Sequence, residues 1–204
     1  LTERQRYKLL SGTIVPRPIA LVTTISADGV LNAAPFSFFN ILSADPGILA
    51  LGIEPNEDGE PKDTSRNIRQ TQQFTVNIVS MAMVERMNIC AISFESSENE
   101  LEMAGFETSA GKFVGCPYVK DAPAAFECTH FVSLAVSPSR DIILGKIVGA
   151  HFRDDVVDFE TFRIDPAQLD PVGRIEGANY ATVRDRFSLA GLTPEEWRKG
   201  NGKE

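Results

Sequence analysis

Residues 17–40, RPIALVTTISADGVLNAAPFSFFN, carry the most information about how this chain folds. An apolar run at residues 19–25 is followed by the dipeptide Asp28-Gly29 and by a second run, residues 30–39, that ends in aromatic and small polar side chains. An Asp-Gly pair between two apolar runs indicates a β-hairpin, because glycine readily adopts the positive φ that a tight turn requires. The stretch therefore predicts two antiparallel strands that can form part of a barrel wall.

A second informative segment is residues 62–68, KDTSRNI, which places cations, two hydroxyls and an amide at the predicted start of a helix over residues 63–71. Asp63 or Thr64 is expected to cap that helix. Backbone N–H groups at a helix start bind anions, and Lys62 and Arg66 add positive charge. The segment is therefore a candidate phosphate site, and the alternative is an ordinary capped and solvated helix start.

The rest of the chain has the pattern of many strands and few helices. Strands are expected at residues 48–53, 74–79, 126–137 and 142–152, and helices at residues 2–10, 82–92, 98–104 and 194–199. Strands joined by short turns predict a mainly β fold, an antiparallel Greek-key-like barrel with peripheral helices. No linker or repeat divides the chain. We therefore expect one domain over residues 1–204, with a core at about residues 15–187 and helical extensions at its ends.

Composition narrows the class of protein further. The chain is 43% hydrophobic and 24% charged, which favours a soluble globular domain over a disordered one. Its formal net charge of −8 opposes binding to nucleic acid or to anionic membranes, because both depend on Lys and Arg. Cys90, Cys116 and Cys128 form neither a metal-binding pattern nor a disulfide framework, so reduced thiols in a cytoplasmic protein are expected. We see no signal peptide and no apolar run long enough to span a bilayer.

Motifs of several reaction classes are missing from the sequence. HExxH, GxSxG, Walker and GxGxxG patterns do not occur, and no metal site is expected. His130 and His151 are the only histidines, and because both lie in predicted strands we expect structural roles for them. Hydrolysis, acyl transfer and phosphoryl transfer are therefore disfavoured, since no nucleophile–base pair is apparent.

Hydride transfer by a bound flavin needs none of those groups, because the ring carries the chemistry and the protein supplies binding and orientation. Residues 33–40, AAPFSFFN, suit such a site. Small residues allow the backbone to approach a ligand, Ser37 and Asn40 can form hydrogen bonds, and Phe38 can pack near a ring. The alternatives are that the aromatic residues are simply core and that Ser37 and Asn40 form turn or edge hydrogen bonds.

Five motifs in order, RPIALVTT, NAAPFSFFN, SADP, KDTSRNI and RIEGANY, resemble those of the flavin reductase-like family of FMN-binding split barrels, particularly its longer branch. The resemblance runs from about residue 15 to residue 187, nearly the whole chain. It implies a split β-barrel fold, FMN as cofactor and NADH or NADPH as co-substrate. One departure is Gly47 in SADPG, where the family often has a second proline; this affects loop stiffness and removes no ligand.

The resemblance also implies a set of cofactor-binding residues. The resemblance implies that the KDTSRNI segment binds the FMN phosphate. Within it, Asp63 can cap the helix instead of contacting the phosphate, because two anions repel each other. Strand alternation allows only one of Thr23 and Thr24 to face the flavin, and Thr24 is favoured. The expected set is Thr24, Ser37, Phe38, Asn40, Lys62, Asp63, Thr64, Asn67 and Arg174, with no catalytic side chain.

Two arginines have more than one interpretation. Arg174, in the RIEGANY motif with Tyr180, can neutralise a phosphate or the negative charge of reduced flavin, and the alternative is a surface ion pair. The same alternatives stand for Arg17, which lies between two prolines that fix the local backbone.

The function that these features predict is an FMN-binding oxidoreductase, a flavin reductase that passes electrons to a small-molecule acceptor or to a flavin-dependent monooxygenase. A non-catalytic FMN protein, acting in electron transfer or redox sensing, is the alternative, and a related oxidase of a B6 vitamer has no specific support. A homodimer is expected from the resemblance. Apolar residues in loop-like segments also suggest it, unless they line one core: Phe113, Val114, Tyr118, Val119 and Phe126.

Overall fold

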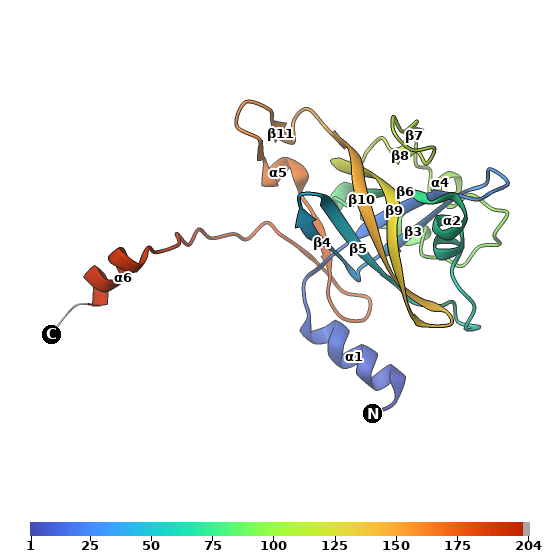
Figure 1. Ribbon diagram of the computed structural model, residues 1–204, viewed down its shortest axis with the longest axis horizontal. Helices are drawn as coiled ribbons and strands as arrows, with labels where there is room; N and C mark the ends of the chain where they lie inside the picture. Colours follow the sequence, from blue (N-terminus) through green and yellow to red (C-terminus); the bar gives the residue numbers. More distant parts are fainter. Residues whose placement is uncertain (202–204) are drawn as a thin grey trace.

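The computed structural model describes residues 1–201, and its centre is a seven-stranded sheet (Figure 1). The strand order is β3-β2-β6-β9-β10-β5-β4, and every neighbouring pair is antiparallel. This confirms the mainly β, antiparallel prediction. The strands are β2 (Ala20–Ile25), β3 (Leu31–Phe36), β4 (Phe39–Ala44), β5 (Gly47–Ile53), β6 (Gln73–Ile78), β9 (Ala124–Ser137) and β10 (Arg140–Phe152).

Short elements surround this sheet. The helices are α1 (Glu3–Thr13), α2 (Asp63–Thr71), η1 (Met81–Met83), α3 (Val84–Ile89), α4 (Glu100–Met103), α5 (Pro166–Leu169) and α6 (Pro194–Asn201). The minor strands are β1 (Arg17–Pro18), β7 (Thr108–Ser109), β8 (Tyr118–Val119), β11 (Val157–Asp158), β12 (Arg163–Ile164), β13 (Val172–Arg174) and β14 (Tyr180–Thr182). None of the described helices is long and apolar enough to cross a membrane.

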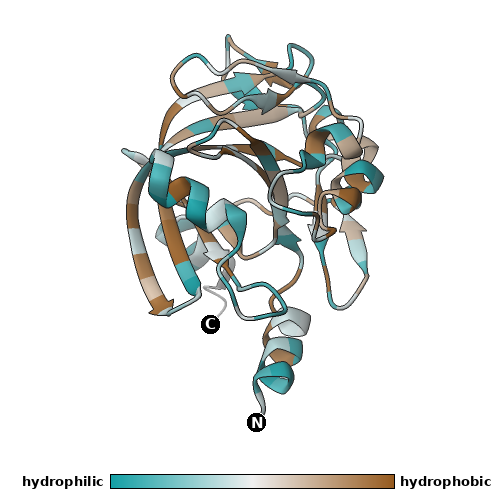
Figure 2. Ribbon diagram, turned by 90° about the vertical axis from the view of Figure 1, so that its right-hand side faces the viewer, coloured by the Kyte–Doolittle hydropathy of each residue, from teal (hydrophilic) through white to brown (hydrophobic). Residues whose placement is uncertain are grey.

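Strand β2 separates two buried clusters, because its side chains alternate between the two faces of the sheet. Ala20 and Val22 belong to an inner cluster with Phe74 and with Ile68 of α2. Leu21 belongs to an outer cluster that η1, α3 and α4 cover with Met83, Met87 and Leu101. Hydrophobic segments run along the strands in Figure 2, whereas α1 projects from the body and is largely hydrophilic. The alternation thus fixes which side of the hairpin faces α2.

The hairpin predicted around Asp28-Gly29 is present as β2–β3, and Gly29 has a φ of 87°. The single strand expected over residues 30–39 is wrong, since β3 ends at Phe36 and β4 begins at Phe39. At this bend the Gly52 N–H donates to the Phe38 carbonyl at 2.7 Å, and a Cβ on Gly52 would lie 2.9 Å from the Cβ of Phe38. A glycine on β5 therefore makes room for the bend that carries Ser37 and Phe38.

Helix α2 begins and ends at the predicted residues, but its predicted caps are wrong. Lys62 is the N-cap residue, and its side chain forms no capping hydrogen bond. Asp63 instead pairs with Arg66 and accepts a hydrogen bond from Ser96 at 2.9 Å. The helix expected over residues 82–92 is shorter and is divided into η1 and α3. At the amino end, Thr2 caps α1 through a capping box with Gln5.

The chain leaves the body after β14 and ends in α6, where a terminal helix was predicted (Figure 1). Along residues 183–201 the large apolar side chains of Phe187, Leu189 and Trp197 are exposed. Cys90, Cys116 and Cys128 are all buried and free, and burial raises the pKa of each thiol to about 12. These thiols therefore stay protonated at neutral pH.

Candidate functional site

The predicted phosphate segment lies on a cavity of about 400 Å³. Lys62, Asp63 and Thr64 form one wall at the start of α2. The end of β3 and the loop of residues 90–96 form the other walls. Three of the four residues expected at the phosphate are therefore together on one cavity, while Asn67 is not among its lining residues.

A buried network of four polar side chains fixes this end of α2 against the hairpin. Asn32 Nδ2 donates to Thr24 Oγ1 at 3.2 Å and to Thr64 Oγ1 at 3.1 Å, and Asn67 Nδ2 donates to Thr24 Oγ1 at 3.1 Å. Thr24 is fully buried, so this network lies behind the cavity wall. Thr24 and Asn67 hold the helix start in place, whereas the hydroxyl of the neighbouring Thr23 donates to the Pro117 carbonyl at 2.5 Å. That Thr24 faces a flavin stays a prediction.

Asn32 is a site residue that the sequence interpretation missed. It lines the cavity and joins strand β3 to helix α2 through the network just described. The signal in the sequence was the position of Asn32 in the second strand of the hairpin, directly opposite Thr24. That signal could not be used without knowing that α2 packs on the same face.

The cavity combines a positive helix start with several acids. The first-turn N–H groups of α2 have no side-chain acceptor, and Lys62 Nζ is positioned by Asn56 Oδ1 at 3.2 Å. Glu57, Asp58 and Glu95 also line the cavity. Glu100 accepts a hydrogen bond from the Ala33 N–H at 2.9 Å, and burial raises the pKa of its carboxyl, which favours the neutral form. Among the described residues, Lys62 is therefore the one cation that lines this cavity, and the other charged residues of its lining are all acidic: Glu57, Asp58, Asp63, Glu95 and Glu100.

Ser37, Phe38 and Asn40 lie on a different cavity, of about 370 Å³, between α1 and the β3–β4 bend. Arg17 also lines it, with Nε 3.3 Å from Ser37 Oγ and its guanidinium carbon 5.9 Å from the centre of the Phe38 ring. The predicted ring-binding residues are thus together. Phe36, the last residue of β3, lines the first cavity. The bend that follows it separates Ser37, Phe38 and Asn40 from the predicted phosphate segment.

Arg174 lies away from the phosphate segment. Its guanidinium donates to the Tyr180 hydroxyl and the Gly177 carbonyl, and stacks 4.4 Å above the Tyr180 ring. In the sheet it is the antiparallel partner of Arg17. Arg174 and Tyr180 of the RIEGANY motif are therefore in contact with each other. They lie next to Arg17 and do not line the cavity at the start of α2.

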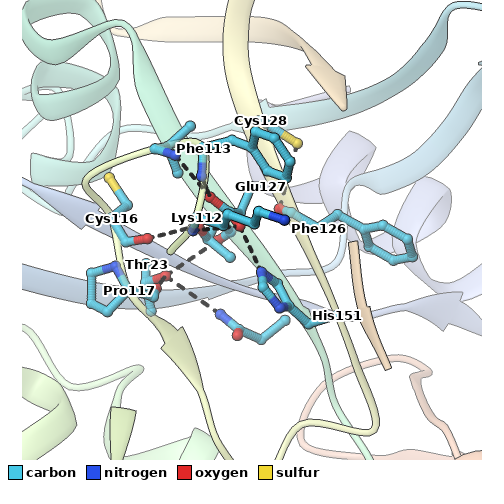
Figure 3. Close-up of polar contacts among 12 residues, drawn as sticks. Thr23, Lys112, Phe113, Cys116, Pro117, Phe126, Glu127, Cys128 and His151 are labelled. Carbon is cyan, nitrogen blue, oxygen red and sulfur yellow. Dashed lines mark hydrogen bonds and ion pairs between the residues drawn. The ribbon is translucent and has the colours of Figure 1, made fainter. Parts of the chain in front are cut away.

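A third polar constellation, shown in Figure 3, holds the irregular segment 111–119 against the sheet. Glu127 is fully buried, and its carboxylate accepts hydrogen bonds from the N–H groups of Lys112 (2.9 Å), Phe113 (2.6 Å) and Val114 (2.8 Å). His151 Nε2 lies 2.6 Å from the same carboxylate, and its ring stacks on Tyr118 at 4.1 Å. The geometry agrees with the structural role expected for His151.

The pKa of Glu127 follows from these contacts. Burial alone would raise it, but the hydrogen bonds from the Lys112 N–H, from His151 and from the Phe113 and Val114 N–H groups outweigh burial and lower the pKa to about 2. The carboxylate is therefore ionised across the physiological range.

The structure is an antiparallel split barrel with a cavity at the start of α2. The chain belongs to the flavin reductase-like domain family, whose model matches residues 11–164. An uncharacterized protein of Deinococcus radiodurans is 38% identical over 205 residues, which cover 98% of this chain and 90% of that protein.

Two solved structures extend this comparison. The 2-nitrobenzoate 2-nitroreductase NbaA of Pseudomonas fluorescens is 36% identical, with a TM-score of 0.85 over 95% of this chain and 94% of that one. Nitrilotriacetate monooxygenase component B from Bacillus cereus is 34% identical, with a TM-score of 0.87 over 93% of this chain and 95% of that one. The split-barrel fold and the family expected from the five motifs are thereby confirmed.

Proposed function

We propose that this protein is an FMN-dependent flavin reductase, which takes hydride from NADH or NADPH and passes electrons to a small-molecule acceptor or a flavin-using monooxygenase. The observation that supports it most directly is the cavity at the start of α2, which Lys62 lines and where the first turn has no side-chain cap. Relatives named as a nitroreductase and as a monooxygenase component B agree with this class of reaction.

In this proposal the chain's residues bind and orient the flavin. Lys62, the first-turn amides of α2 and the hydroxyl of Thr64 hold the phosphate, with the buried network behind them. Ser37 and Asn40 form hydrogen bonds at the edge of the ring, and Phe38 packs beside it. Bound FMN supplies the hydride-accepting chemistry, so no side-chain acid or base is required. We also propose that the chain acts as one domain.

Anaerobic mixing of the purified protein with FMN and either nicotinamide tests the proposed function. We expect the visible absorbance of oxidised flavin to disappear at ~1 s⁻¹ or faster with at least one nicotinamide, which is the lower range of ordinary enzyme turnover. Free FMN with each nicotinamide is the control. A rate no higher than that control would contradict the reductase function and favour a non-catalytic FMN carrier.

We further propose that the protein is a homodimer, for a reason different from the one the sequence offered. Of the loop residues named in the sequence, Val114 and Val119 are buried within the chain and need no partner, whereas Phe113 is exposed. An apolar face instead covers the outer side of β5, β9 and β10, where side chains alternate with the buried inner row. We call it the outer sheet face, and it consists of Ala50, Gly52, Leu134, Val136 and Ile142.

Light scattering at micromolar concentration tests this assembly. We expect a mass twice that of one chain, and we expect Leu134→Lys to shift it toward the monomer, because a charge would be buried in the interface. Met103→Lys, at an exposed apolar residue on α4, is the matched control and should leave the mass unchanged. A monomeric wild-type protein with FMN bound would contradict the proposal.

A further inference from the structure

The end of the chain forms an apolar arm that its own body leaves exposed. We call residues 183–201 the C-terminal arm; it follows β14 and ends in α6, and Figure 1 shows it extending away from the sheet. Its large side chains are open to solvent, with Phe187 90% exposed, Leu189 87% and Trp197 57%. Several large apolar side chains exposed in one short segment mark an interaction site, because monomers rarely expose such patches.

Polar contacts tie only the base of the arm to the body. Arg184 pairs with Asp170 at 2.7 Å, whereas Lys199 pairs with Glu195 inside the arm. Within the described part of the chain, no hydrogen bond or ion pair joins residues 185–201 to the body. The extended residues 185–193 span up to about 30 Å, well beyond the ~16 Å radius of gyration expected for a body of this size. The arm therefore reaches a second molecule while its base stays anchored.

The same chain carries an apolar surface that also lacks a cover. On the outer sheet face, the side chains of Leu134, Val136 and Ile142 are exposed. Leu134 and Ile142 are paired across β9 and β10, so their side chains lie on one side of the sheet. An arm and a face that are both uncovered in one chain fit each other across a two-fold axis, because each copy then supplies both surfaces.

The area of the arm is sufficient for a stable dimer. A buried aromatic side chain removes about 150–250 Å² from water, so Phe187 and Trp197 of two arms together remove roughly 600–1,000 Å². The surface that they cover removes a comparable area, and the total then falls in the range of stable interfaces, about 1,200–2,000 Å². The arm also has four cations against three acids in a chain of net charge −8, so it approaches a second copy with less repulsion than the rest of the surface.

We propose that the C-terminal arm of each copy packs on the outer sheet face of a second copy, where the side chains of Phe187 and Trp197 are buried. Removal of apolar surface from water then holds the two copies together. The exchange of arms rests on the homodimer proposed above and names the segment that closes it. The outer sheet face accordingly receives the arm of the other chain, and neither its own arm nor a different protein.

Trp197 is the only tryptophan in the sequence, so tryptophan emission reports the surroundings of the arm. In the concentrated, FMN-bound dimer we expect emission at shorter wavelength than that of N-acetyltryptophanamide mixed with the same amount of FMN. Dilution should move the emission to longer wavelength in step with the loss of dimer mass in light scattering.

Three other outcomes of this titration are distinguishable. Long-wavelength emission from a dimer would overturn the exchange of arms and leave the homodimer standing. Emission that stays at short wavelength after dissociation would assign the arm to its own body and would also overturn the exchange. A protein that is monomeric at every concentration would contradict the homodimer and the exchange together.

Variants identify the two surfaces. Phe187→Ser should raise the dissociation constant of the dimer about tenfold or more, because each dimer loses two buried aromatic side chains. Phe159→Ser, at an exposed aromatic residue outside the arm, is the matched control and should leave the constant unchanged. Leu134→Lys should move the emission of Trp197 to longer wavelength. An unchanged dissociation constant in Phe187→Ser, or short-wavelength emission in Leu134→Lys, would refute the proposed contact.

Discussion

The Glu127→Gln variant should unfold at a clearly lower urea concentration than the wild type, with a loss of about 3 kcal/mol in the free energy of unfolding. The wild-type carboxylate satisfies three backbone N–H groups and His151 (Figure 3). An amide offers a single acceptor oxygen and turns an NH₂ group toward donors. At least one buried N–H then loses its acceptor, which costs more than a net hydrogen bond contributes.

A matched control variant accompanies that measurement. Glu107→Gln makes the same chemical change in a pair with Lys120 whose side chains are 78% and 50% exposed, and it should cost no more than about 1 kcal/mol. An equal loss in the two variants would contradict the role assigned to Glu127.

The pH dependence gives an independent check on Glu127. Its folded pKa of about 2 lies below the ordinary value of 4.5, so its contribution to stability is fully present above pH 4.5. That contribution should be lost as the pH falls from 4.5 toward 2. The difference in unfolding free energy between wild type and Glu127→Gln should therefore shrink over this interval. A difference that stays constant would show that ionisation of Glu127 is not what stabilises the fold.

Replacing Lys62 and Thr64 together by alanine should weaken FMN binding about 10- to 150-fold, equivalent to ~1.5–3 kcal/mol. The change removes a charge and a hydroxyl from two residues that line the α2 cavity. Lys62→Ala alone is the cleaner variant, because Thr64 also accepts a hydrogen bond from Asn32 and its loss disturbs the buried network. Calorimetry of FMN binding is the measurement.

Riboflavin and a distant lysine provide the controls for this prediction. Wild type should bind FMN more tightly than riboflavin, which lacks the phosphate, and the variant should lose most of that preference. Lys146→Ala, at an exposed position on β10 that lines neither site cavity, should leave both affinities unchanged. If Lys62→Ala bound FMN as tightly as the wild type, the phosphate would have to bind at another site.

The parts of the fold that the sequence predicted are those determined by local chemistry. The Asp28-Gly29 turn needs only a residue that tolerates positive φ, and α2 ends where Gln72 leaves the helical conformation at a φ of 59°. Strand β4 was missed because the bend before it depends on Gly52, which is distant in sequence and close only after β5 has formed. Contacts between distant residues leave no periodic signal in either segment.

The candidate site divides in the same way. Lys62, Asp63 and Thr64 are neighbours in the chain. Predicting the start of one helix was therefore enough to predict that they lie together. Glu127 gave a weaker signal, a single acid within the apolar run AAFECTHF, and its donors come from a turn-rich segment with no recognisable pattern. The surroundings of Arg17 could not be predicted, because one of its acceptors, the Ile175 carbonyl, comes from a segment that is distant in the chain.

The network of Thr24, Asn32, Thr64 and Asn67 has a consequence for the thermodynamics of ligand capture. These side chains are buried and hydrogen-bonded to one another, so the fold itself holds the start of α2 in place. The loss of conformational entropy needed to fix this helix end therefore accompanies folding and is not subtracted from the affinity when an anion arrives.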